Sequence, residues 1–165
     1  MYSIKTNTKY IYIMNKIIVP IDFSEYSEYA LETAAILAKR YDADLLVLHM
    51  LELDKGSLIS SGNDQNQQMV FYLKLAEQKF ENYLDKAFLE GVNVTPIVKH
   101  FKVFSEVAEV AEEHDADMIV MGSHGASGLS EIFVGSNTEK VVRHSEIPVL
   151  VVKQKPEQLN FEIGR

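Results

Sequence analysis

Two glycine-containing stretches of the sequence have the residue types that hold phosphate groups. Gly122–Gly125 reads Gly-Ser-His-Gly, and Gly135-Ser136 follows after nine further residues. Glycine lets a ligand approach the backbone closely, and it adopts positive φ without strain. The first N–H groups of a helix bind anions because they have no partner within the helix. A helix that begins at the second stretch would therefore place an anion site in this loop.

Side chains around the second stretch favour such a helix. Ser136 and Glu139 have the S-x-x-E spacing of a capping box, which predicts a helix that starts near Asn137. The hydroxyls of Ser136 and Thr138 would add donors for a phosphate, and Ser123 is a further candidate. Spacing leaves two interpretations open here: a phosphate site, or plain turn chemistry in which capping fully occupies Ser136.

Other motifs for phosphate binding or catalysis are absent from the sequence. Neither the P-loop pattern G-x-x-x-x-G-K-[ST] nor the dinucleotide pattern G-x-G-x-x-G occurs. Ser123 is no nucleophile elbow, because Met121 stands where the first glycine belongs. The histidines show no H-E-x-x-H spacing, and only His124 lies inside the loop. Rapid phosphoryl transfer needs positive charge, and the loop contains neither Lys nor Arg. We therefore predict no catalytic and no metal-ligating side chain.

The composition narrows the class of protein. A chain of 165 residues fits one domain. Its net charge of −8 disfavours nucleic-acid and membrane-surface partners, because both are anionic. The absence of cysteine excludes disulfides, thiolate metal sites and thiol nucleophiles. No apolar run approaches the roughly 20 residues that cross a bilayer, and no signal core is present. We expect a cytoplasmic protein.

The elements that must position the loop alternate between strand and helix. Short apolar runs predict five strands, at Lys16–Ile21, Leu45–Met50, Val92–Val98, Asp117–Met121 and Pro148–Lys153. Helical spacing predicts four helices, one capped by Ser24, one from Val70 to Phe88 that Gly91 ends, one from near Ser105 and one from near Asn137. This alternation predicts an α/β fold, a doubly wound parallel sheet with helices on both faces and ligands at the carboxyl ends of its strands.

Segments outside this pattern mark the domain limits. We expect an N-terminal extension over 1–13, one domain over 14–153 and a charged tail over 154–165. Met14 lies two residues before the first strand, which favours a translation start there; alternatively, Tyr10–Ile13 forms a short extra strand. The polar stretch Glu52–Gln68 is expected to be a surface loop. Pro148 at the start of the last strand favours an edge position.

The motifs taken together resemble the universal stress protein family. The signature Gly122-x-x-Gly125-x9-Gly135-Ser136 is similar to the nucleotide-binding signature of that family. It is accompanied by Val19–Ser24, Leu48–Met50 and Ile147–Val152, so the resemblance covers about Asn15 to Lys153. It implies a five-stranded sheet in the order 3-2-1-4-5, similar to adenine nucleotide alpha hydrolases.

The resemblance further implies a site for ATP, ADP or AMP, with Mg²⁺ bridging the phosphates. Asp22 would face the ribose or adenine and the backbone near Met50 would contact the base; helix capping by Asp22 and core packing by Met50 are the alternatives. Asn137 departs from many relatives, which carry an apolar residue there. The implied binding residues are Pro20, Ile21, Asp22, Met50, Gly122, Ser123, His124, Gly125, Gly135, Ser136, Asn137 and Thr138.

The family also implies an assembly and a role. Its members form homodimers, commonly by pairing the last strand, here Pro148–Val152. We therefore expect a dimeric, nucleotide-dependent regulator of a stress response that is not primarily an enzyme. The alternatives are a dimeric adaptor that works without nucleotide and a slow ATPase that uses His124.

Overall fold

The computed structural model describes residues 14–51, 63–100, 106–124 and 134–155. Several sequence-based expectations concern residues beyond these ranges. They are the N-terminal extension with its strand alternative at Tyr10–Ile13, the first part of the loop expected from Glu52, the role of Gly125 and most of the C-terminal tail.

Five parallel strands form one sheet in the order β3-β2-β1-β4-β5, which confirms the predicted fold class and strand order. Strand β1 lies in the centre, and β5 lies at an edge, as Pro148 predicts. The strands are β1 (Lys16–Ile21), β2 (Asp44–Leu51), β3 (Val94–His100), β4 (Met118–Gly122) and β5 (Val149–Val152).

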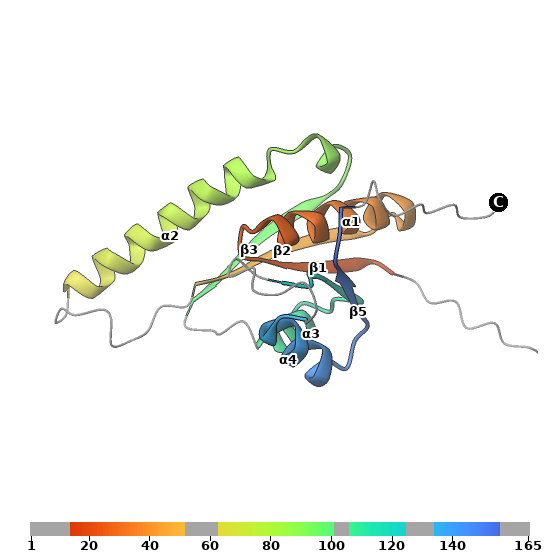
Figure 1. The fold of residues 1–165 in the computed structure, drawn as a ribbon. Helices are drawn as coiled ribbons and strands as arrows, with labels where there is room; N and C mark the ends of the chain where they lie inside the picture. Colours follow the sequence, from red (N-terminus) through yellow and green to blue (C-terminus); the bar gives the residue numbers. More distant parts are fainter. Residues whose placement is uncertain (1–13, 52–62, 101–105, 125–133, 156–165) are drawn as a thin grey trace, which may run out of the picture.

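Helices cover both faces of the sheet, as predicted. In Figure 1, α1 and α2 lie above the sheet, whereas α3 and α4 lie below it. The helices are α1 (Glu25–Tyr41), α2 (Asn63–Leu84), α3 (Val107–Glu113) and α4 (Ser136–His144), with a short 3₁₀ helix η1 (Ala87–Leu89) after α2. No helix within the described ranges is both long enough and apolar enough to span a membrane.

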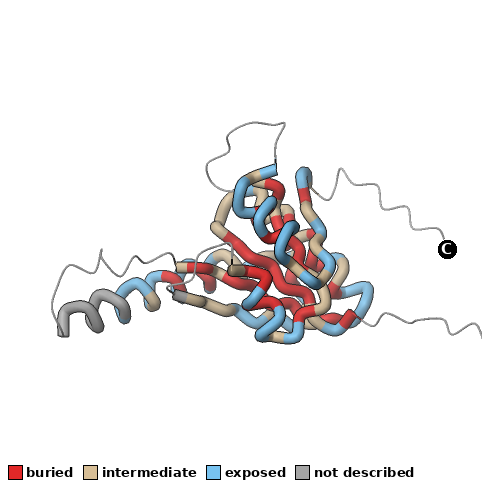
Figure 2. The backbone as a smooth tube through the Cα atoms, turned by 90° about the horizontal axis from the view of Figure 1, so that it is seen from below, coloured by how far each residue is buried: buried red, intermediate tan, exposed pale blue. Residues whose placement is uncertain are grey.

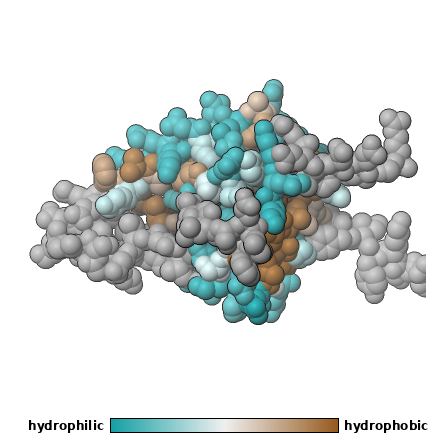
Figure 3. All heavy atoms as spheres, viewed as in Figure 1, coloured by the Kyte–Doolittle hydropathy of each residue, from teal (hydrophilic) through white to brown (hydrophobic). Residues whose placement is uncertain are grey.

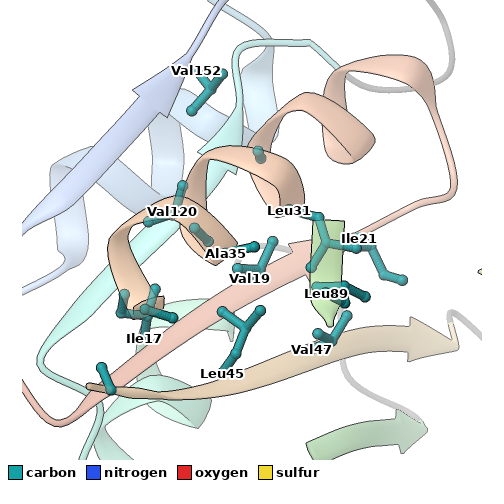
Figure 4. Packing of buried hydrophobic residues seen from close by; sticks show 14 of the residues in the cluster. Ile17, Val19, Ile21, Leu31, Ala35, Leu45, Val47, Leu89, Val120 and Val152 are labelled. Carbon is teal, nitrogen blue, oxygen red and sulfur yellow. The ribbon is translucent and has the colours of Figure 1, made fainter. Parts of the chain in front are cut away.

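Alternate residues of β1 point to opposite faces and join two separate cores. Ile17, Val19 and Ile21 pack with α1 in the first core, and Ile18 packs with α3 in the second. Figure 4 shows the first core, and Figure 2 shows that buried residues run along the central strands. Burial on both faces explains why the β1 sequence is continuously apolar rather than alternating.

Helix α2 corrects two expectations. It begins at Asn63, inside the stretch expected to be a loop, and it ends at Leu84. A helix that projects beyond the sheet needs no apolar stripe along its first turns, so hydrophobic periodicity missed its start (Figure 1). Gly91 does not stop α2; it has φ 79° in the turn that follows η1, where glycine avoids the strain of a left-handed backbone.

Candidate functional site

A pocket of about 360 Å³ opens at the carboxyl ends of β1 and β4. Within the described pairings, these strands are joined at Ile17 with Met118 and at Ile18 with Ile119, and not beyond. Pro20 is therefore tolerated in a central strand, because no hydrogen bond to β4 is lost there. The chain winds in opposite directions from β1 and β4, and the crevice between such strands is where doubly wound folds bind ligands.

Residues from β1, β2, β4 and the start of α4 converge on this pocket. All the residues predicted from the sequence line it except Ser123, which lies behind it, and Gly125, which lies outside the described residues. The lining is Pro20, Ile21, Asp22, Ser27, His49, Met50, Met121, Gly122, His124, Gly135, Ser136, Asn137 and Thr138.

Helix α4 starts at the pocket without a side-chain cap. Gly135 is its N-cap residue, with φ −58° and ψ 148°, and no side-chain cap is present. The predicted capping box is therefore wrong: Ser136 is already the first helical residue, and the Glu139 carboxylate instead accepts a 2.9 Å hydrogen bond from Arg143 Nε. Within the described residues, glycine at the N-cap leaves the first N–H groups of α4 without an intrahelical or side-chain acceptor. As far as these residues show, the N–H groups are open to an anion.

Thr138 fixes the start of α4 against β4. Its Oγ1 donates a 2.9 Å hydrogen bond to the Gly122 carbonyl, and the residue is only 4% exposed. The single hydroxyl proton of Thr138 is thus already used within the protein. Contrary to the expectation from sequence, this hydroxyl positions the helix and is not a donor for a ligand.

Ser123 holds the frame behind the pocket. Its N–H donates to the Val152 carbonyl at 2.8 Å, and its own carbonyl accepts from the Gly135 N–H at 2.8 Å. Its Oγ lies 2.9 Å from Nδ1 of His124, whose ring also packs on Tyr26 at 5.1 Å between centroids. The sequence showed no group that orients His124; the structure supplies Ser123 and Tyr26.

Glycine is needed at position 122 for close packing and not for an unusual backbone conformation. It is the last residue of β4, and a Cβ there would lie 2.8 Å from the carbonyl carbon and oxygen of Tyr26. Such distances are closer than van der Waals contact allows. The first turn of α1 can approach β4 only because residue 122 has no side chain.

The turn between β1 and α1 shapes the opposite wall of the pocket. Asp22 Oδ1 accepts a 3.0 Å hydrogen bond from the Ser24 N–H, and Ser24 Oγ accepts from the Ser27 N–H at 3.2 Å. Ser24 is thus the predicted N-cap of α1. Asp22 lines the pocket and also holds this turn, so its two proposed roles are compatible.

His49 and Met50 close the end of the pocket at β2. The His49 Nδ1 lies 3.0 Å from the Ile21 carbonyl oxygen, which only accepts, so Nδ1 carries the proton. Burial lowers the pKa of His49, which keeps the ring neutral at pH 7. Met50 is 5% exposed and belongs to the second core as well as to the lining.

Sequence analysis missed three lining residues. Ser27, His49 and Met121 were not among the predicted binding residues, although all three line the pocket. The positions of His49 and Met121 at the carboxyl ends of β2 and β4 were the available signal. Ser27 follows Ser24 by one helical turn, and nothing in its residue type indicates that it faces a ligand.

The pocket lining carries little charge and no metal cluster. Asp22 is its one carboxylate among the described residues, and it contains neither Lys nor Arg. No group of three or more His, Asp or Glu within those residues could hold a metal ion. Any anion bound here would depend on backbone N–H groups, hydroxyls and its own counterion.

Comparison with known proteins places this geometry in a family. Residues 14–153 match the model of the Universal stress protein family. The universal stress protein MJ0577 of Methanocaldococcus jannaschii is 32% identical over 154 residues, which cover 85% of this chain and 95% of that protein. The solved structure of protein MJ0577 matches with a TM-score of 0.72 at 34% identity, covering 87% of this chain and 99% of that one.

Two more distant structures share the fold. One is a universal stress protein in complex with cAMP, with a TM-score of 0.56 at 21% identity over 86% of this chain and 98% of that one. The other, from Archaeoglobus fulgidus, is in complex with dAMP, with a TM-score of 0.54 at 22% identity over 86% of this chain and 100% of that one. Because the family match spans the whole sheet and its helices, this chain belongs to the universal stress protein family.

Proposed function

We propose that this chain binds an adenine nucleotide, ATP with Mg²⁺, in the pocket between β1 and β4. The observation that carries the proposal is the start of α4, which faces the pocket without a side-chain cap. Backbone N–H groups at the positive end of a helix suit a phosphate chain. They supply the attraction that a lining without Lys or Arg otherwise lacks.

The two ends of the pocket differ in the way a nucleotide requires. At the end formed by β1 and β2, the 5% exposed Met50 gives the lining an apolar side chain that suits a base, and Asp22 offers a carboxylate to ribose hydroxyls. At the other end, Ser136 and Asn137 present exposed polar groups on the first turn of α4. Mg²⁺ would be held by phosphate oxygens and water, which is its usual coordination beside nucleotides.

We propose regulation, rather than catalysis, as the main role. Transfer of a phosphoryl group needs strong positive charge, and the described lining has no Lys or Arg. Slow hydrolysis is a second candidate, favoured by the hydrogen bond between Ser123 and His124, because an oriented imidazole can act as a base.

A homodimer through β5 is part of the proposal, as is a role in a cytoplasmic stress response. Strand β5 lies at the edge of the sheet, and Leu150 on it is 36% exposed. Figure 3 shows hydrophobic atoms gathered over this strand. An apolar edge strand with no neighbour on its outer side within the described residues is a site for strand pairing. The alternative is a dimeric adaptor that works without nucleotide.

The first experiment identifies the resident ligand. The protein is purified without added nucleotide and denatured, and the released small molecules are identified by mass spectrometry. Near-stoichiometric adenine nucleotide supports the proposal. An empty pocket, together with no heat on titration with Mg-ATP, AMP, cAMP or dAMP, contradicts it and favours the adaptor. Phosphate release that disappears in His124→Gln would establish the slow ATPase.

A further inference from the structure

Phe23 follows Asp22 and has a backbone conformation that is unfavourable for a residue with a side chain. Its φ is 63°, in the left-handed region that non-glycine residues rarely occupy. Asp22 holds the following turn through its hydrogen bond to the Ser24 N–H. The orientation of the Asp22 carboxylate in the pocket therefore depends on whether Phe23 stays in this conformation.

Three residues of helix α2 contact the Phe23 side chain. The Phe23 ring meets Tyr83 edge-on at 5.1 Å and Phe80 at 5.8 Å between centroids. The Lys79 ammonium lies 4.1 Å from the centre of the same ring. Edge-to-face aromatic pairs and a cation over a ring face are both attractive. These contacts offset the backbone strain at Phe23 and fasten α2 to the turn after β1.

The same contacts continue to two residues of the pocket lining. His49 packs on Phe23 at 4.6 Å and on Phe80 at 6.0 Å. The Ser27 hydroxyl donates to the Ser24 carbonyl at 2.9 Å, so Tyr83 Oη is the donor in its 3.3 Å hydrogen bond to Ser27 Oγ. Helix α2 thus touches the back of the lining at two points without lining the pocket itself.

The contacts with Phe23 matter because the two halves of α2 differ in how they are held. The amino-terminal half extends beyond the sheet (Figure 1) and carries exposed Val70, Phe71 and Tyr72. Phe80, in the carboxyl-terminal half, is 2% exposed and belongs to the first core. A helix held at one end responds to any change at the residues that hold it.

We infer that Phe23 is a positioning residue that couples occupation of the pocket to the docking of α2. The nucleotide side of this inference rests on the proposed function, whereas the docking side concerns the protein without ligand. A nucleotide that contacts Asp22 or His49 stabilises the turn, and the turn stabilises α2 through Phe23. By thermodynamic reciprocity, loosening α2 weakens nucleotide binding by the same factor by which nucleotide tightens α2.

The test compares amide hydrogen exchange of residues 76–84 with and without Mg-ATP, and nucleotide affinity by calorimetry. In Phe23→Ala we expect exchange in the free protein to accelerate about tenfold, because three ring contacts are lost. Phe23→Gly relieves the backbone strain and loses the same contacts, so α2 should loosen equally. Phe23→Tyr keeps a ring and should restore both the slow exchange and the affinity.

A surface variant keeps the test independent of folding. Lys79 is exposed, so Lys79→Ala leaves the core intact while it removes the cation over Phe23, and it should accelerate exchange about two- to fivefold. Lys74→Ala, an equally exposed change on α2, is the matched control and should change nothing.

The outcomes separate the two claims. If the wild-type protein binds Mg-ATP but exchange of residues 76–84 is the same with and without it, the coupling is wrong and the proposed function stands. If no adenine nucleotide binds, the proposed function fails and coupling to nucleotide fails with it. Exchange in the free Phe23→Ala variant then still decides whether Phe23 docks α2, and wild-type rates there would overturn that role as well.

Discussion

Two helices begin at the same pocket, and their first turns are built in opposite ways. Helix α1 has a side-chain cap, in which Ser24 Oγ accepts from the Ser27 N–H, and it has Glu25 and Glu28 in its first turn. Helix α4 has glycine at its N-cap and no side-chain cap. One helix start is closed by the protein's own groups, whereas the other is left open.

The difference assigns separate tasks to the two walls of the pocket. The first turn of α1 holds two carboxylates, whereas that of α4 holds one, Glu139, which is paired with Arg143, so a bound anion gains more at α4. The closed start of α1 instead fixes the position of Asp22, through the hydrogen bond that Asp22 accepts from Ser24. A polar pocket can therefore take its rigidity from one helix and its affinity for anions from the other.

The largest effect should come from breaking the contact that brings α1 to the pocket. Gly122→Ala places a Cβ 2.8 Å from the Tyr26 backbone, so α1 or β4 must move. We expect the free energy of unfolding to fall by about 2 kcal/mol or more in urea denaturation. Gly91→Ala is the control: its Cβ meets nothing within 4 Å, so the change costs about 1 kcal/mol through positive φ. Equal losses would show that Gly122 is not a packing glycine.

Closing the open helix should weaken binding while it stabilises the free protein. Asn137→Asp keeps the shape of an exposed residue on the first turn of α4 and adds a negative charge there. Repulsion of a phosphate should raise the Kd for Mg-ATP about tenfold. The same charge at the positive end of α4 should raise the free energy of unfolding by about 0.5 kcal/mol.

Calorimetric titration and urea denaturation measure the two opposite effects of this change. Asn82→Asp on α2 is the control for the titration, since it adds the same charge to an exposed position outside the pocket lining. In urea its stability should fall rather than rise, because the Asn82 amide donates to the Gln78 carbonyl near the negative end of α2. Unchanged nucleotide affinity in Asn137→Asp would place the phosphates elsewhere.

A pair of serine variants compares the two helix starts directly. Ser24→Ala removes the cap of α1 and should lower the free energy of unfolding by about 1 kcal/mol. Ser136→Ala removes a hydroxyl that caps nothing, so its effect should stay within about 0.5 kcal/mol. Urea denaturation of the free protein measures both changes in the free energy of unfolding. If Ser136→Ala lowers the free energy of unfolding as much as Ser24→Ala does, Ser136 caps α4 after all.

The two helix starts also show how far the sequence predicts the structure. Continuous apolar runs located β1, β2 and β4, because burial on both faces leaves a pattern that few other elements share. Ser24 was recognised as a cap and Ser136 was mistaken for one, since both precede a helical pattern. Which residue takes the N-cap depends on the backbone angles at Gly135, and local residue types do not encode them.

Contacts between distant segments were beyond prediction for a related reason. The fit of Gly122 against Tyr26 and the ring of Phe23 against α2 depend on how α1 and α2 pack on the sheet. Glycine spacing predicts that Gly122 and Gly135 belong to one site, and both line the pocket, but it gives Gly122 a different role from the packing role that the structure shows. Residues brought together by packing, such as His49 and Phe23, leave no local signature at either position.

The smallest expected effect is a change in stability with pH at His49, which lines the pocket and donates to the Ile21 carbonyl. Burial, helped by nearby Lys79, lowers the pKa of His49 from 6.5, against the opposing effects of the Ile21 carbonyl and Asp22. Below pH 6.5 the unfolded chain therefore binds a proton more readily than the folded chain. The contribution of His49 to stability is complete above pH 6.5 and is lost as the pH falls through the lower pKa of the folded state.

Urea denaturation between pH 8 and pH 5 measures this loss. We expect the wild-type protein to lose more stability on acidification than His49→Asn, whose amide keeps a donor near the Nδ1 position. His144→Gln, an exposed change at the end of α4, should lose as much as the wild type. If His49→Asn and the wild type lose the same stability between pH 8 and pH 5, protonation of His49 does not cause the loss.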